Sequence, residues 1–243
     1  MAKRLRIFAG PNGSGKSTYI KDFQNLEEQN IYLGFYVNAD DIEQSLKNQR
    51  KIDFSDFGIL TNTIHIQEYF KHSTFAPVKL NLPDLWKDFT VNENTLSIAT
   101  SLDINSYIAA DLAEYIRQQL LEAGLSFSYE TVMSDEKKIE FLIKAKEAGY
   151  WIYLYFFCTK DPLINISRVD GRVVQNGHAV PAKVIEDRYY RSLSNLKAAV
   201  KNSRRAYLFD NSNISLLVAE ITHGTTVNLI DSVPDWVRKY LID

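Results

Sequence analysis

The sequence has one cysteine and almost no net charge, and each of these features excludes some classes of protein. A single cysteine cannot form an internal disulfide, which suits a reducing compartment. Because Cys158 sits in an apolar run, an inert core thiol is far more common there than a catalytic one. The 28 Lys and Arg against 30 Asp and Glu favour neither nucleic acid nor an anionic membrane as a partner. No apolar run approaches about 18 residues, so we expect no membrane span and a cytoplasmic protein.

Residues 10–18 read Gly-Pro-Asn-Gly-Ser-Gly-Lys-Ser-Thr and fit the P-loop pattern G-x-x-x-x-G-K-[ST] without a mismatch. Leu5–Ala9 before the loop predicts a buried strand, and Thr18–Phe23 predicts the first turns of a helix. In that context the glycines let backbone N–H groups converge on phosphate, beside the positive end of the helix dipole. Lys16 can reach the β and γ phosphates of ATP, and Ser17 can offer its hydroxyl to Mg²⁺. The residues predicted to bind ATP and Mg²⁺ are Gly10, Pro11, Asn12, Gly13, Ser14, Gly15, Lys16, Ser17 and Thr18.

Strands alternate with helices along the chain, which is typical of a parallel sheet covered on both faces. The strongest strand is a continuous β-branched and aromatic run at 151–157. We therefore expect a three-layer α/β P-loop kinase fold in a single domain, 1–243, with a mostly parallel five-stranded sheet and a small C-terminal hairpin and helix. The expected strands are Arg6–Ala9, Phe35–Asn38, Leu125–Tyr129, Trp151–Phe157 and Arg205–Phe209. The expected helices are Asn105–Glu122, Asp135–Ala148, Pro162–Val173, Pro181–Val200 and Pro234–Leu241, and the expected hairpin strands are Leu216–Ile221 and Thr225–Ile230.

Acidic residues follow three of the expected strands, at the sheet edge where ligands of parallel sheets bind. They are Asp40 and Asp41 after the second strand, Glu130 after the third, and Asp210 after the fifth. Each acid taken singly is more often a helix cap or a solvated loop residue, and Asp41 could cap a helix that begins at Ile42. Phosphoryl transfer, however, needs one carboxylate near Mg²⁺ and another near the acceptor hydroxyl.

A basic stretch follows the fourth strand. Arg168 and Arg172 are four residues apart, so they share one face of a helix. A glycine-containing loop with His178 comes next, and then a helix that carries Arg188 and Arg191. For any one of these arginines, a solvated helix face is an equally common interpretation. Arginines around such a loop are nevertheless what a kinase lid requires, because they neutralise charge on the transferred phosphoryl group and close the site to water.

Four segments together resemble the zeta-toxin-like P-loop kinases. They are Gly10–Thr18, Val37–Ile42, Phe127–Thr131 and the stretch Arg168–Arg191 with its Gly-His-Ala-Val-Pro sequence. The resemblance covers most of the chain outside residues 51–100, and its last stretch is considerably more specific than the P-loop.

The resemblance implies a kinase that uses ATP and Mg²⁺. Zeta toxins phosphorylate the 3′-hydroxyl of the amino sugar of UDP-N-acetylglucosamine, which starves cell-wall synthesis, and a small antitoxin holds them in check. Lys16 and Ser17 match the residues for ATP and Mg²⁺. Asp40 matches the general base, Glu130 the acid of the substrate pocket, and Arg168 the first phosphate-clamping arginine.

The chain departs from that family pattern in two places. The second clamping arginine falls in the lid, where this chain reads Asn176-Gly-His178. Arg172, Arg188 or His178 would have to substitute for it. Segment 51–100 is also longer than the usual connection. It is either a surface insertion with a small packing cluster of its own, or a cap over the acceptor site that changes substrate choice.

Two function classes remain open. The first is a small-molecule kinase, with UDP-N-acetylglucosamine as the leading acceptor by resemblance and other nucleotide sugars or nucleotides as possibilities. The second is a P-loop ATPase or switch that couples hydrolysis to a protein partner. The chain has no Leu-Ser-Gly-Gly signature and no apolar strand ending in an Asp-Glu pair, which counts against the second class. For the first class the expected catalytic residues are Lys16, Asp40, Arg168 and Arg172, and the expected substrate-binding residues are Asp40, Asp41, Glu130, Thr131 and His178.

Overall fold

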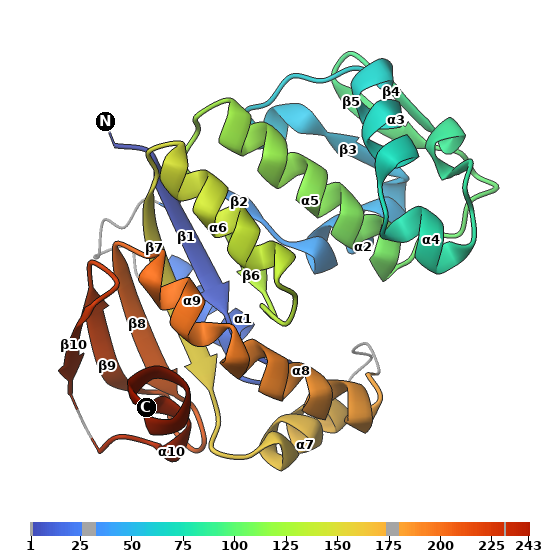
Figure 1. Cartoon of the computed structure of the whole chain (residues 1–243). Coiled ribbons are helices and arrows are strands. Elements are labelled where there is room, and N and C mark those ends of the chain that lie inside the picture. The colour runs from blue at the N-terminus through green and yellow to red at the C-terminus, as the bar shows by residue number, and fades with distance from the viewer. Residues whose placement is uncertain (1, 26–32, 174–179, 231) are drawn as a thin grey trace. The chain divides into compact units, whose positions relative to one another are not determined.

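A computed structural model describes residues 2–25, 33–173, 180–230 and 232–243 (Figure 1). The chain divides into two compact units. Unit 1 comprises Met1–Tyr32 and Ser128–Asp243, and unit 2 comprises Leu33–Phe127. Within the described ranges, no helix is both long and apolar enough to cross a membrane. The single domain expected from the sequence stays a prediction.

Unit 1 is built on a mostly parallel sheet with the strand order β10-β9-β8-β7-β1-β6. The strands β1, β7 and β8 run parallel, while β9 is antiparallel to β8 and β10 is antiparallel to β9. In β7 every residue from Leu154 to Cys158 is buried, as its continuous apolar sequence predicts. The strand bounds are β1 Arg4–Ala9, β6 Phe127–Thr131, β7 Trp151–Cys158, β8 Arg205–Asp210, β9 Leu216–Thr222 and β10 Thr226–Leu229.

Helices cover both faces of this sheet. Phe157 of β7 contacts the ring of Tyr19 on α1, with the ring centroids 4.8 Å apart. Its neighbour Phe156 contacts Trp236 of α10 at 6.1 Å. Because successive strand residues point to opposite faces, α1 and α10 must lie on opposite sides of β7. The helix bounds are α1 Lys16–Asn25, α6 Lys137–Glu147, α7 Pro162–Val173, α8 Ala182–Ser194, α9 Leu196–Lys201, α10 Asp235–Val237 and the π-helical turn η4 Arg238–Ile242.

The expected α/β fold class is confirmed, with two corrections in unit 1. The C-terminal hairpin β9–β10 is not a separate small element, because β9 pairs with β8 and extends the sheet beyond the five strands expected. The single helix expected over Pro181–Val200 is interrupted at Asn195, the C-cap of α8. The side-chain amide of Asn195 donates to the carbonyl oxygen of Met133 at 3.0 Å, which fixes the chain where α8 gives way to α9.

Unit 2 contains a second sheet that the sequence did not predict. Its strand order is β3-β5-β4, with both neighbouring pairs antiparallel. The turn between β4 and β5 places Glu93 and Asn94 at positive φ, as a two-residue hairpin turn requires. Buried aromatic rings of Phe54, Phe70 and Phe89 form its core. The element bounds are β2 Phe35–Val37, α2 Ala39–Gln49, β3 Lys51–Asp53, η2 Phe54–Phe57, α3 Thr63–His72, α4 Ala76–Leu80, η3 Leu85–Asp88, β4 Phe89–Asn92, β5 Thr95–Ile98 and α5 Ser106–Glu122.

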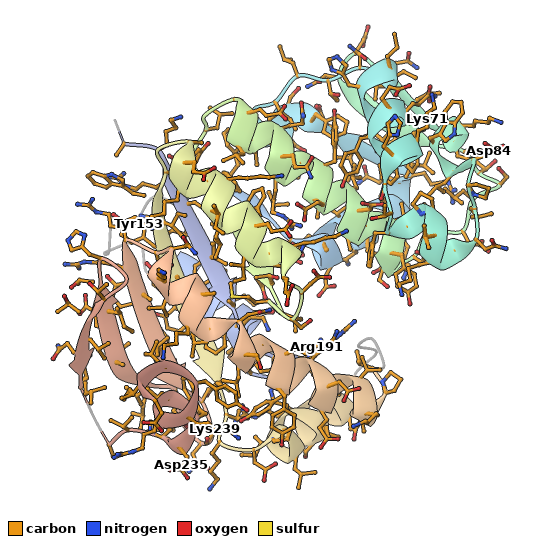
Figure 2. All side chains as sticks on the ribbon, viewed as in Figure 1. Lys71, Asp84, Tyr153, Arg191, Asp235 and Lys239 are labelled. Atoms are coloured by element: carbon orange, nitrogen blue, oxygen red, sulfur yellow. The ribbon has the colours of Figure 1, made fainter. Side chains whose placement is uncertain are left out.

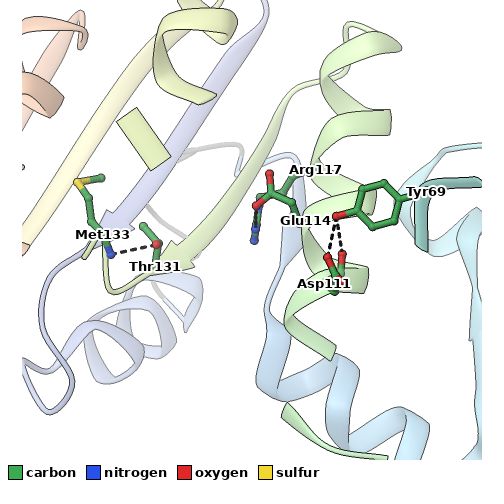
Figure 3. A network of polar contacts seen from close by, with 6 residues as sticks. All are labelled: Tyr69, Asp111, Glu114, Arg117, Thr131 and Met133. Atoms are coloured by element: carbon green, nitrogen blue, oxygen red, sulfur yellow. Dashed lines mark hydrogen bonds and ion pairs between the residues drawn. The ribbon is translucent and has the colours of Figure 1, made fainter. Parts of the chain in front are cut away.

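A buried carboxylate on α5 joins the helices of unit 2 (Figure 3). Asp111 is 4% exposed. It accepts hydrogen bonds from the hydroxyl of Tyr69 at 3.0 Å and from the hydroxyl of Ser73 at 2.5 Å. It also accepts one from the backbone N–H of Ala76 at 3.1 Å, at the start of α4. Burial and the nearby Asp111 carboxylate raise the pKa of the Tyr69 phenol well above its usual value, so this hydroxyl stays a donor.

We expect Asp111→Ala to lower the free energy of unfolding by about 3 kcal/mol, because it leaves buried donors without an acceptor. Urea unfolding followed by circular dichroism measures the change. Asp103→Ala, an exposed carboxylate of the same unit, is the matched control and should change stability by less than about 0.5 kcal/mol. A loss below about 1 kcal/mol in Asp111→Ala would contradict the assigned role of this carboxylate.

Candidate functional site

The predicted P-loop connects β1 to α1 and packs tightly against the ends of neighbouring strands in unit 1. Gly10 has φ 138°, and a Cβ there would lie 2.0 Å from the carbonyl oxygen of Phe157. Gly15 has φ 93°, and a Cβ there would lie 1.9 Å from Nδ2 of Asn211. Only glycine fits either position, so the sequence pattern reflects the close approach of the loop to β7 and to the residue that follows β8.

Two asparagine side chains orient the backbone of the loop. Nδ2 of Asn165 donates to the carbonyl oxygen of Asn12 at 2.6 Å, and Nδ2 of Asn211 donates to the carbonyl oxygen of Ser14 at 2.8 Å. In each peptide unit the next N–H points opposite to the carbonyl. The N–H groups of Gly13 and Gly15 are therefore directed away from the asparagines, as a phosphate cradle requires.

Lys16 and Ser14 give the loop its chemistry. Lys16 is 9% exposed, and its Nζ donates to the carbonyl oxygens of Gly10 at 2.8 Å and Pro11 at 2.9 Å. The ammonium group is thus held over the loop rather than in solvent. Ser14 is fully buried, and its hydroxyl has no hydrogen-bond partner within the described part of the chain. A buried hydroxyl without a partner is costly, which fits a site that takes a polar ligand.

Ser17 and Glu130 lie together although they are far apart in the sequence. The hydroxyl of Ser17 donates to Oε2 of Glu130 at 2.8 Å. A hydroxyl beside a carboxylate suits Mg²⁺, which binds proteins through one or two oxygen ligands and keeps waters and substrate phosphates as the rest. Among the residues described, no group of three or more His, Cys, Asp and Glu side chains could hold a metal alone. A Mg²⁺ ion at this pair would take its remaining ligands from water and from substrate phosphates.

Thr131, at the end of β6, serves the backbone around the loop. Its hydroxyl accepts a hydrogen bond from the N–H of Met133 at 3.1 Å (Figure 3). Its carbonyl oxygen accepts one from the N–H of Gly10 at 3.2 Å. These contacts tie the end of β6 to the first residue of the P-loop. The predicted role of Thr131 in substrate binding stays a prediction.

The expected basic stretch contributes arginines from α7 and α8. Nη2 of Arg168 donates to the carbonyl oxygen of Ser212 at 3.2 Å, and Nη1 lies 3.5 Å from the carbonyl oxygen of Gly13. Nη1 of Arg188 lies 3.4 Å from Oδ1 of Asn12. Arg172, one turn beyond Arg168, is exposed. The structure therefore brings Arg168 and Arg188 to the P-loop.

Two other residues of the predicted lid region are His178 and Arg191. His178 lies outside the described residues. Arg191, labelled in Figure 2, is exposed on α8, and its Nε donates to the carbonyl oxygen of Asp187 at 3.4 Å. Among the described residues, this is a hydrogen bond within α8.

Asp210 has a structural explanation. Its Oδ1 accepts from the N–H of Ser212 at 2.9 Å, and its Oδ2 accepts from the indole N–H of Trp236 at 2.9 Å. Asp210 thereby shapes the loop after β8 that carries Asn211 and that Arg168 contacts. Asp210 is the last residue of β8 and is only partly exposed, so the interpretation of this acid as a solvated loop residue was wrong.

Asp40 and Asp41 lie in unit 2, in the first turn of α2, and both are exposed. The helix begins at Ala39, and the side chain of Asn38 caps it by accepting from the N–H of Asp40 at 2.8 Å. The expectation that Asp41 caps a helix starting at Ile42 was therefore wrong. Asparagine is as good a cap as aspartate, and it stands earlier in the chain.

Asp41 also lines a cavity of about 410 Å³ within unit 2. Polar side chains from α2 and from the segment 51–57 surround this cavity, together with the ring of Phe57. Its polar lining includes Tyr36, Asn38, Asp41, Ser45, Gln49, Lys51, Asp53, Asp56 and Thr95.

Sequence reasoning missed Asn165 and Asn211. Asn211 directly follows the acid Asp210 at the end of an expected strand, and that position could have identified it. Asn165 lies inside α7 and carries no comparable pattern. Its contact with the carbonyl of Asn12 depends on how α7 packs against the P-loop.

Comparison with solved structures supports the P-loop kinase fold. The PezAT chromosomal toxin–antitoxin system of Streptococcus pneumoniae matches with a TM-score of 0.50 and 11% identity, over 99% of this chain and 79% of that one. The AvrRxo1-ORF1:-ORF2 complex with ATP matches with a TM-score of 0.52 and 15% identity, over 94% of this chain and 60% of that one. The present chain thus spans about 60% of the AvrRxo1 chain. At these identities the likeness shows the fold alone.

The sequence comparisons identify the family. No curated protein matches the chain. The profile described as zeta toxin matches residues 92–221, a span that includes Glu130, Arg168 and Arg188. The match covers more than half of the chain and supports a P-loop phosphotransferase. The chain belongs to the zeta toxin family.

Proposed function

We propose that the protein transfers the γ-phosphoryl group of Mg·ATP to a hydroxyl group of a small molecule. The observation that carries the proposal is the set of groups gathered around one loop of unit 1. It consists of the buried ammonium of Lys16, the Ser17–Glu130 pair and the guanidinium of Arg168. Cation, Mg²⁺ ligands and arginine are the parts that phosphoryl transfer reuses, because its catalysis is almost entirely positioning and charge stabilisation.

Each group has a distinct role in the proposed reaction. The acceptor oxygen forms a bond to the γ-phosphorus as the bond to the leaving ADP oxygen breaks, and Asp40 takes the acceptor proton. Lys16 and the loop N–H groups neutralise the β and γ phosphates. Ser17 and Glu130 would hold Mg²⁺, and the ion would lower the negative charge on the phosphates. Arg168 stabilises charge on the transferred group, with Arg172, Arg188 or His178 as the second cation.

The acceptor follows from the resemblance, which points to UDP-N-acetylglucosamine or a related nucleotide sugar. A zeta-type toxin would then have a small antitoxin as its protein partner. Two structural relatives support such a partner: PezAT is a toxin–antitoxin system, and AvrRxo1-ORF1 is complexed with ORF2. The alternative is a P-loop ATPase or switch that hydrolyses ATP for a protein partner.

One experiment separates the two proposals. The protein is incubated with ATP, Mg²⁺ and a panel of nucleotide sugars and nucleotides, and mass spectrometry looks for an acceptor mass gain of about 80 Da, one phosphoryl group. A kinase releases ADP in step with the modified acceptor. Release of ADP at the same rate without any acceptor would instead indicate the ATPase.

The Ser17–Glu130 pair makes a separate prediction about Mg²⁺. Glu130→Gln removes a charged ligand, so we expect about tenfold more Mg²⁺ for half-maximal activity. Binding of ATP without Mg²⁺ should stay within about twofold by calorimetry, because Glu130 does not contact the nucleotide in this proposal. Glu140→Gln, an exposed acid on α6, is the control. An unchanged Mg²⁺ requirement in Glu130→Gln would return this acid to the substrate pocket that the resemblance gave it.

A further inference from the structure

The strand β10 lies at an open end of the unit 1 sheet (Figure 1). It is the last strand in the order and pairs with β9 alone, in an antiparallel register from Thr226 opposite Thr222 to Leu229 opposite Ala219. Its other edge therefore presents backbone groups that no strand of the described chain uses.

The register shows which residues present those groups. The N–H of Ile230 donates to the carbonyl oxygen of Val218 at 3.0 Å, just beyond the end of the strand. Residues of an antiparallel strand alternate between bonding their neighbour and facing away from it. Thr226 and Asn228 therefore bond β9, and Val227 and Leu229 direct their N–H and C=O groups away from it.

The side chains of β10 leave this edge unprotected. All four residues are exposed, including Val227 at 42% and Leu229 at 46%. From Thr225 to Ile230 the sequence has no charged residue and no proline. Natural edge strands usually carry lysine, proline, a bulge or a covering segment, because an open apolar edge pairs with other strands.

We propose that β10 pairs with β10 of a second copy of this chain, antiparallel and centred on Asn228. In that register Val227 lies opposite Leu229 of the second copy, and the outward groups of both residues meet in about four backbone hydrogen bonds. Asn228 meets its own copy, so the contact is isologous and closes as a dimer. The edge from Thr225 to Ile230 carries no charge, so two copies meet without electrostatic repulsion. The same lack of charge gives the edge nothing with which to attract a charged strand of another protein.

The contact between the two β10 strands is small. Two strands of four residues bury less than the roughly 1,200–2,000 Å² of a standard stable interface. We expect a weak, concentration-dependent dimer, with a dissociation constant on the order of tens of micromolar. It adds a mode of self-association to the protein without involving the P-loop.

Sedimentation velocity of the full chain from about 1 to 300 µM, a range chosen to bracket this affinity, tests the proposal. Val227→Pro removes an outward N–H that β9 does not use, a position where an edge strand tolerates proline. Leu229→Lys introduces one lysine in each copy, and the dimer would bring these two positive charges close together. We expect dimer in the wild type at the upper concentrations and at least about tenfold weaker association in both variants, equal to the 1.4 kcal/mol of a tenfold affinity change.

Ile64→Lys is the matched control, since Ile64 is 71% exposed on α3 of unit 2, and it should associate as the wild type does. Far-UV circular dichroism and the thermal midpoint check each fold, and Leu229→Lys decides the matter if the proline variant does not fold. A wild type that stays monomeric over the whole range overturns the proposal and leaves the edge to a strand of another protein. Undiminished association of folded Leu229→Lys overturns it as well.

Discussion

Arg168→Ala is expected to lower kcat by about a thousandfold, the lower end of the effect of losing an arginine at a transferred phosphate. The guanidinium lies over the P-loop on bonds of 3.2 and 3.5 Å to the neutral carbonyls of Ser212 and Gly13. These bonds are long, so the charge can turn to a phosphate, where charge-assisted bonds are stronger. Steady-state ADP release and acceptor phosphorylation measure the loss, and calorimetry should show ATP affinity changed by less than about tenfold.

Arg172→Ala is the matched comparison, because Arg172 lies one turn away on the same helix and is exposed. If Arg172 is the second clamp, its loss lowers kcat by at least about tenfold. A smaller loss places it on the solvated helix face and leaves Arg188 or His178 as the second cation. A loss below about tenfold in Arg168→Ala itself would contradict the lid proposal for that residue.

The central strand β7 could be predicted because burial on both faces gives it a continuous apolar sequence. The segment Trp151–Cys158 contains no charged residue, so both the presence of a strand and its burial could be predicted. The hairpin of β9 and β10 was predicted from two apolar segments around His223 and Gly224. Its membership of the main sheet was not, because the pairing of β9 with β8 is a tertiary contact that leaves no local pattern.

The sheet of unit 2 could not be predicted from the sequence. Each strand of its sheet has three or four residues, too short for alternation to be distinguished from chance. In β3 only Ile52 is buried. The sheet exists because β5 pairs with both neighbours and because the ring of Phe89 in β4 stacks on the ring of Phe70 in α3, with the centroids 4.3 Å apart. The β4–β5 pairing is a local hairpin, but the β3–β5 pairing and the contact of Phe70 with Phe89 join residues far apart in the sequence.

In the candidate site, too, the local features could be predicted from the sequence and the long-range contacts could not. The P-loop could be predicted because its glycines, Lys16 and Ser17 are contiguous and their spacing is dictated by phosphate geometry. The hydrogen bond from Ser17 to Glu130 spans 113 residues. The bond from Asn211 to Ser14 spans 197. A sequence pattern can suggest that an acid follows a strand, but the partner of that acid depends on the order of strands in the sheet.

Asp40→Asn is expected to reduce kcat for acceptor phosphorylation by at least about a hundredfold, since a general base supplies 10²–10⁴ in rate. The side chain of Asn38, and not that of Asp40, caps α2, so the change should leave the helix intact. Asparagine keeps the size of aspartate and its hydrogen-bond acceptor but cannot take a proton. Calorimetry should therefore find ATP binding unchanged within about twofold, because the base acts on the acceptor alone.

Asp41→Asn is the matched control for this base. Asp41 is one residue further along α2, so its side chain points about 100° away around the helix axis. Asp41 is a predicted acceptor-binding residue and lines the unit 2 cavity, so its change should affect KM for the acceptor more than kcat. If Asp41→Asn proves crippling and Asp40→Asn mild, the base has been assigned one residue too early. If neither variant loses rate and ADP release does not depend on an acceptor, the base assignment is wrong and the ATPase alternative becomes the better account of this P-loop.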